Sequence, residues 1–157
     1  MRAMAFCREW CENVPMSQKC FFYVYSSVAT KAFTESELLE LLKRSREANA
    51  KLGLSGMLLY KNGDFLQVLE GSEPVVQTMI RKIRLDSRHH DMVKLLEGDY
   101  AERQFPYWHM GFSNLDTEEA KNTPGYTEFL NTSLSVGLAA DPTVCQRLLH
   151  LFKEREC

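Results

Sequence analysis

The sequence predicts an α+β fold: a ferredoxin-like βαββαβ order with an extra strand at its end. Three observations support it. Apolar segments with the two-residue period of strands alternate with segments of helical period in that order. Asn62-Gly63 lies between two apolar runs, which is the strongest short hairpin signal. Two helical stretches begin with good starting residues. We therefore expect an antiparallel sheet with two helices on one face and C-terminal helices on the other.

The first strand and helix come directly after residues 1–20, which lack periodicity and are predicted to form a flexible tail. The run from Cys20 to Ser26 is aromatic and β-branched, which is typical of a strand covered on both faces. Thr34 and Glu37 form a capping box, in which each side chain satisfies the other residue's backbone amide. A helix is therefore expected to follow Thr34.

Asn49 is a polar residue on the apolar stripe of this helix. Seven residues at 100° each place it about 20° from Leu42, on the buried side. A buried amide without partners costs about 1–3 kcal/mol, so this side chain needs a ligand or a protein partner. The alternative is that it caps the C-terminus of the helix near Gly53.

The hairpin predicts a second buried amide. Residues 56–61 and 64–70 form its two strands, and the type I′ turn between them needs positive φ at both central residues. In the second strand Phe65, Gln67 and Leu69 share one face, because side chains alternate along a strand. Gln67 thus lies between apolar neighbours.

The remaining elements of the domain are a helix and two strands. Pro74 is expected at the first position of a helix that ends near Asp86. Residues 88–91 are expected to be a polar link, followed by a strand at 92–96. A fifth strand is expected at 107–112, with Trp108 and Met110 on the same face.

A C-terminal helix is expected after Asp141-Pro142. Its apolar stripe consists of Val144, Cys145, Leu148, Leu149 and Phe152. The stripe covers the second face of the sheet or, alternatively, binds a partner. The chain thus divides into a tail at 1–20, a domain at 21–114 and a helical cap at 115–157.

Composition excludes several classes of protein. Of 157 residues, 45% are hydrophobic and 25% charged, which is not the composition of a disordered chain. A net charge of −2 argues against nucleic-acid binding, and no apolar run is long enough to span a membrane.

Five scattered cysteines without a secretory signal indicate a reduced, cytoplasmic protein. Cys7 and Cys11 lack the further ligands of a metal site, because Val14 stands where a cluster motif needs a third thiolate.

Known catalytic motifs are missing, and acidic residues are not paired in apolar contexts, so we expect no enzyme. What remains is an apolar interior that contains Tyr25, Ser27, Asn49 and Gln67. Apolar walls with a few amides suit a planar, uncharged heterocycle.

Five segments in order and register, across residues 21–114, resemble a BLUF domain, the flavin-based blue-light sensor. They are Tyr25-Ser26-Ser27, Asn49 with Gly56-Met57-Leu58, Phe65 to Gly71, Asp86-x-Arg88-His89 and Phe105-Pro106-x-Trp108-x-Met110. The C-terminal helix is similar to that of short, stand-alone, cyanobacterial-type members.

This resemblance implies a flavin, FAD with FMN or riboflavin as alternatives, between the two helices. Light would draw an electron and a proton from Tyr25 through Gln67, and on their return a rearranged Gln67 amide would give a red-shifted signalling state. Trp108 or Met110 would transmit the change. The implied cofactor-binding residues are Ser27, Ser45, Asn49, Phe65, Gln67, Lys82, Asp86, Arg88 and His89.

The resemblance also implies a homo-oligomer that signals to a protein effector of response-regulator-like type. Two departures concern flavin affinity: Ala48 replaces a polar residue found in many members, and Lys82 replaces an arginine. Two alternatives stay open. One is a flavin-free interaction module; the other is an acylphosphatase-like hydrolase, although residues 27–31 lack the glycine and arginine of its anion cradle.

Overall fold

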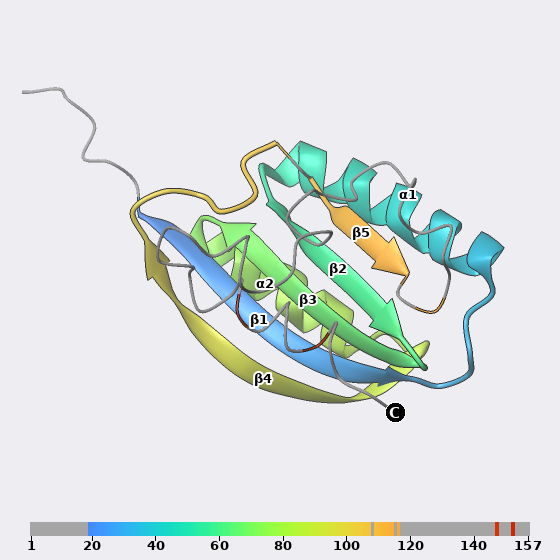
Figure 1. The fold of residues 1–157 in the computed structure, drawn as a ribbon. Helices are drawn as coiled ribbons and strands as arrows, with labels where there is room; N and C mark the ends of the chain where they lie inside the picture. The colour runs from blue at the N-terminus through green and yellow to red at the C-terminus, as the bar shows by residue number, and fades with distance from the viewer. Residues whose placement is uncertain (1–18, 108, 115, 117–146, 148–151, 153–157) are drawn as a thin grey trace, which may run out of the picture.

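The structure, a computed structural model, describes residues 19–107, 109–114, 116, 147 and 152. A five-stranded sheet in the order β4-β1-β3-β2-β5 carries two helices (Figure 1). Its elements are β1 (Cys20–Ala29), α1 (Glu35–Leu52), β2 (Ser55–Lys61), β3 (Asp64–Gly71), α2 (Glu73–Arg84), β4 (His89–Tyr100) and β5 (Gly111–Asn114). The predicted α+β, ferredoxin-like order with an extra strand is confirmed.

Local sequence signals set the bounds of α1 and of the hairpin as expected. The Glu37 backbone N–H donates to Thr34 Oγ1 (3.2 Å), and the Thr34 N–H donates to Glu37 Oε2 (2.9 Å), so the capping box is present. Gly53 ends the helix with a φ of 65°. At the hairpin turn Asn62 and Gly63 have φ values of 51° and 83°, as a type I′ turn requires.

The edges of the sheet differ from the prediction. β4 begins at His89 rather than Met92, because His89 and His90 continue the ladder opposite Ala29 and Val28 of β1. The sheet is mixed rather than wholly antiparallel, since β5 pairs in parallel with β2. Pro74 occupies the second position of α2, after Glu73, and the helix ends at Arg84.

The fifth strand was predicted at 107–112 and is found at Gly111–Asn114. Two residues just before it, His109 and Met110, have their carbonyl groups bound by side chains of α1 instead. Arg46 Nε donates to the carbonyl oxygen of Met110 (2.9 Å), and Asn49 Nδ2 donates to that of His109 (2.5 Å). Trp108 lies outside the described residues.

The two faces of the sheet form separate apolar clusters. The first, between the sheet and the two helices, includes Tyr25, Leu38, Leu58 and Ile80. The second, on the opposite face, includes Val24, Leu59, Val68 and Phe105, and Phe152 packs against it. Phe152 belongs to the predicted C-terminal stripe; the other stripe residues lie outside the described part, as does the predicted tail up to residue 18. Within the described residues neither helix is long and apolar enough to cross a membrane.

Candidate functional site

A pocket opens between α1 and α2 above β1 and β3. It holds about 830 Å³ of space between atoms, part of it open to solvent. Apolar side chains from both helices and the sheet form its walls, among them Phe33, Leu41, Leu58, Met79 and Ile83. The ring of Phe33 meets that of Phe65 edge-on, with centroids 5.3 Å apart. The pocket therefore offers apolar surface to a flat ligand.

Nearly all the residues that the sequence predicts for ligand binding line this pocket. Nine of the ten named for photochemistry or cofactor binding line it: Tyr25, Ser27, Ser45, Asn49, Phe65, Gln67, Asp86, Arg88 and His89. Lys82 is exposed on α2 and is not among the lining residues that the structure describes. Ala48 also lines the pocket, so the departure noted there falls within the site.

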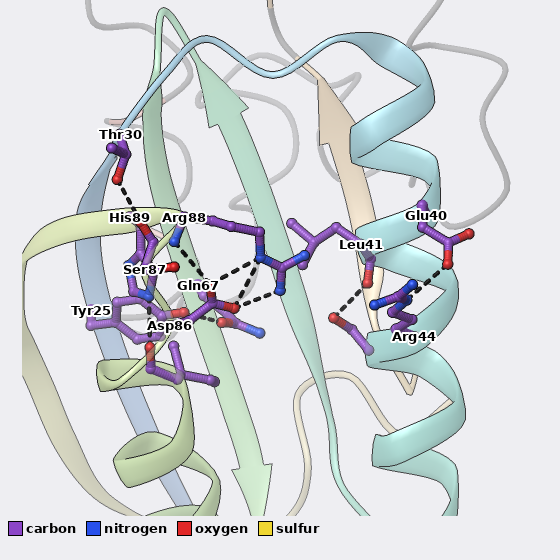
Figure 2. A network of polar contacts seen from close by, with 12 residues as sticks. Tyr25, Thr30, Glu40, Leu41, Arg44, Gln67, Asp86, Ser87, Arg88 and His89 are labelled. Atoms are coloured by element: carbon purple, nitrogen blue, oxygen red, sulfur yellow. Dashed lines mark hydrogen bonds and ion pairs between the residues drawn. The ribbon is translucent and has the colours of Figure 1, made fainter.

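Tyr25 and Gln67 meet at the floor of the pocket, because β1 and β3 pair in a register that places them opposite each other. The Tyr25 hydroxyl donates a hydrogen bond to Gln67 Oε1. Both side chains are buried, and Figure 2 shows them pointing toward one another from neighbouring strands. Burial, with a smaller contribution from Asp86, raises the pKa of Tyr25. Tyr25 therefore stays protonated well above neutral pH.

The other end of the Gln67 amide contacts Met110. Gln67 Nε2 donates to Met110 Sδ over 3.6 Å, and Met110 is 1% exposed. The structure places Met110 beside Gln67, and Trp108, the other residue considered for this contact, lies outside the described residues. The amide thus joins Tyr25 to the segment that precedes β5.

Asn49 is buried, as its position on the helix predicts. Its amide nitrogen donates to the His109 carbonyl oxygen rather than capping α1, so the capping alternative is wrong. The C-terminus of α1 is satisfied by backbone groups instead, since Leu54 N–H donates to the Asn49 carbonyl (2.9 Å).

Charged residues lie at the mouth of the pocket. The Arg88 guanidinium makes a two-pronged contact with Asp86, with Nε–Oδ1 at 2.9 Å and Nη2–Oδ2 at 2.5 Å (Figure 2). Hydrogen bonding from Arg88 lowers the pKa of Asp86 to about 2. The turn that carries this pair is tied to the end of β1, because Thr30 Oγ1 donates to the Ser87 carbonyl (2.8 Å).

Two buried polar atoms in the pocket lining have no hydrogen-bond partner among the described residues: Ser27 Oγ and His89 Nδ1. His89 Nε2 lies 2.7 Å from the Ile83 carbonyl and donates to it, so Nδ1 is the ring nitrogen that can pair with a ligand. Buried polar groups are nearly always paired. These two atoms therefore fit a ligand with polar groups along its edge, such as a flavin.

Sequence reasoning missed several residues near the site. Arg44 lines the pocket and pairs with Glu40 (2.8 Å), but no motif in the sequence singled it out. The Arg46 and His109 side chains bind backbone carbonyl groups that lie 64 and 55 residues away in the chain, and no sequence pattern predicts such contacts.

The model of a family described as sensors of blue-light using FAD (BLUF) matches residues 21–111, more than half of the chain. A photoactivated adenylate cyclase subunit beta of Euglena longa is 37% identical over 82 residues, which cover 52% of this chain and 10% of that protein. The chain thus spans about a tenth of that relative's length.

Solved structures also match this chain. Klebsiella pneumoniae BlrP1 with FMN and cyclic diGMP matches with a TM-score of 0.68 and 27% identity, over 85% of this chain and 34% of that one. BlrB, a BLUF protein in its dark state, matches with a TM-score of 0.62 and 24% identity over 87% and 98%, which shows the shared fold. The family match, the relatives and the arrangement of the pocket lead to one conclusion: the chain belongs to the BLUF family of blue-light sensors that use FAD.

Proposed function

We propose that this chain binds a flavin non-covalently between α1 and α2 and senses blue light through the Tyr25–Gln67 pair. The observation that carries the proposal is the hydrogen bond from the Tyr25 hydroxyl to Gln67 Oε1 at the floor of an apolar pocket. Ser27 and His89 support it, because each has a buried polar atom in the same pocket without a hydrogen-bond partner in the described part of the chain. FAD is the proposed flavin, and FMN and riboflavin are the alternatives.

A bound flavin supplies a light-excited electron acceptor. Tyr25 is the proposed donor of an electron and of its phenolic proton, and Gln67 Oε1 is placed to receive that proton. When both return to Tyr25, the Gln67 amide keeps a rotated or tautomerised arrangement, because its two ends differ in hydrogen-bonding character. The changed amide then meets Met110 differently and donates a new hydrogen bond into the pocket.

The proposed output is a change of protein contact rather than a reaction. The described residues form a sensor, and relatives carry cyclase units in much longer chains. We propose that this chain passes its signal to a protein effector of response-regulator-like type, as a cytoplasmic homo-oligomer. A flavin-free interaction module is the competing function, since Ala48 removes one polar contact from the pocket.

Absorption spectroscopy of the purified chain tests the proposal. The protein is expected to take up FAD and to show a red-shifted spectrum after blue light that reverts in the dark. Gln67→Leu is expected to bind flavin and lose the red shift, because leucine can neither accept the Tyr25 proton nor rearrange. Gln77→Leu, on α2 and outside the pocket lining, is the matched control and should keep the shift.

Two results would contradict the proposal. A colourless protein that takes up none of the three flavins would contradict flavin binding and favour the flavin-free interaction module. A normal red shift in Gln67→Leu would refute the role of the amide while leaving flavin binding intact. Mass spectrometry of the flavin released on denaturation identifies which of the three is bound.

A further inference from the structure

The connection between β4 and β5 links the two edges of the sheet. Figure 1 shows it, in yellow and orange, crossing from the β4 edge to the β5 edge at one end of the strands. It includes Arg103–Phe105 and His109–Met110, and the structure ties it to the domain at two separate places. Met110 then contacts Gln67, so the connection reaches the proposed light-sensing pair.

The first attachment is the carboxylate of Glu70, which is 0% exposed. Glu70 Oε1 accepts from the backbone N–H of Gln104 (2.8 Å), and Oε2 accepts from that of Phe105 (3.0 Å) and from Ser55 Oγ (3.2 Å). Arg103 Nη1 donates to Ser55 Oγ over 2.8 Å. Burial raises the pKa of Glu70. This attachment holds the start of the connection against β3 on the face opposite the pocket.

The second attachment comes from α1. Arg46 Nε donates to the Met110 carbonyl (2.9 Å), and Asn49 Nδ2 donates to the His109 carbonyl (2.5 Å). The His109 ring contributes as well, since its Nδ1 lies 3.1 Å from the Leu54 carbonyl. Two consecutive carbonyl groups are thereby fixed by one face of the helix that also lines the pocket.

Fixing the backbone at Met110 matters because its side chain is flexible. Methionine has three rotatable bonds, so its thioether fills whatever space its backbone position allows. A weak contact of 3.6 Å to an amide nitrogen cannot by itself hold such a side chain in one place. The charged Arg46 donor makes a stronger hydrogen bond than a neutral group would.

We propose that Arg46 is a positioning residue, which holds the Met110 backbone so that its thioether contacts the Gln67 amide. Arg46 is not among the described residues that line the pocket, and it acts through the Met110 backbone. The proposal rests on the proposed light-sensing function. Glu70 serves the same connection at its other end, so loss of Arg46 frees Met110 locally without releasing residues 103–105.

The first test uses the full chain without flavin and needs no photochemistry. Dilute hydrogen peroxide oxidises accessible methionines, and peptide mass spectrometry measures the rate at each one. Arg46→Leu is expected to raise oxidation of Met110 about tenfold, the effect of losing one hydrogen bond to a charged donor. Met57, which is 0% exposed, serves as the internal reference and should not change.

Matched variants separate positioning from general loosening. Lys43→Leu removes the same charge from an exposed position on the same helix and should leave Met110 protected. Arg46→Lys keeps a charged donor and should restore part of the protection. Unchanged oxidation of Met110 in Arg46→Leu would overturn the proposal, and so would an equal rise at Met57, which indicates general unfolding.

The second test uses the flavin-loaded protein. Arg46→Leu is expected to alter the dark reversion rate of the red-shifted state about tenfold at unchanged flavin affinity, and Arg46→Lys to bring it back toward the wild-type rate. An unaltered reversion rate would overturn the role in signalling. If the wild type itself shows no red shift, the proposed function fails, whereas the oxidation result still decides whether Arg46 positions Met110.

Discussion

The Tyr25–Gln67 hydrogen bond can be measured without light through a double-mutant cycle. Tyr25→Phe, Gln67→Leu and the double variant are compared with the wild type in the flavin-free chain. Each single change leaves one buried partner behind: Gln67 Oε1 in the first case and the Tyr25 hydroxyl in the second. The double variant removes both groups. The two changes are therefore not expected to add.

The magnitude follows from the burial of both groups. A hydrogen bond contributes about 0.5–1.5 kcal/mol net, and a buried polar group without a partner costs about 1–3 kcal/mol. Each single variant should therefore lose about 1–3 kcal/mol of unfolding free energy. The double variant leaves neither buried group without a partner. Its loss of unfolding free energy should therefore be smaller than the sum of the two single losses by about 1–2 kcal/mol. For a chain of this size, 1 kcal/mol corresponds to about 2–4 °C in Tm.

Urea unfolding followed by circular dichroism gives the four free energies. Tyr107→Phe combined with Gln67→Leu is the control pair, since Tyr107 is 91% exposed. The control pair should add within about 0.5 kcal/mol. Additive losses for the Tyr25 and Gln67 pair would refute the contact on which the proposed mechanism depends.

Two further predictions concern the backbone and pH. Gly56→Ala should destabilise the fold by about 3 kcal/mol or more in urea unfolding, because an added Cβ would meet the Val68 carbonyl oxygen at 1.9 Å. Gly53→Ala, with open space but a φ of 65°, should cost only about 1 kcal/mol, and equal losses would contradict the steric argument. The pKa of Tyr25 is higher in the folded protein than in the unfolded chain, where it is about 10. The contribution of Tyr25 to stability is therefore fully present below pH 10 and is lost as the pH rises through the folded pKa. Unfolding free energy should therefore fall more steeply above pH 10 in the wild type than in Tyr25→Phe, and parallel curves would contradict this.

Local patterns determined the elements of this protein. The capping box at Thr34, the turn at Asn62-Gly63 and the alternation around Gln67 involve residues a few positions apart, so their physical causes lie within the segment itself. The same alternation placed Gln67 on one face with Phe65 and Leu69, and helical spacing buried Asn49. The candidate pocket was predictable to that extent, because its amides interrupt apolar stripes.

Tertiary structure decided how the amides are used and where the connection to β5 runs. Asn49 binds a carbonyl 60 residues away, Gln67 reaches Met110, and Glu70 holds Gln104 and Phe105. The strand expected at 107–112 begins only at Gly111, and the carbonyl groups of His109 and Met110 just before it bind side-chain donors on α1. Such bonds depend on which distant groups the packed chain brings within about 3 Å, and local periodicity carries no information on that distance.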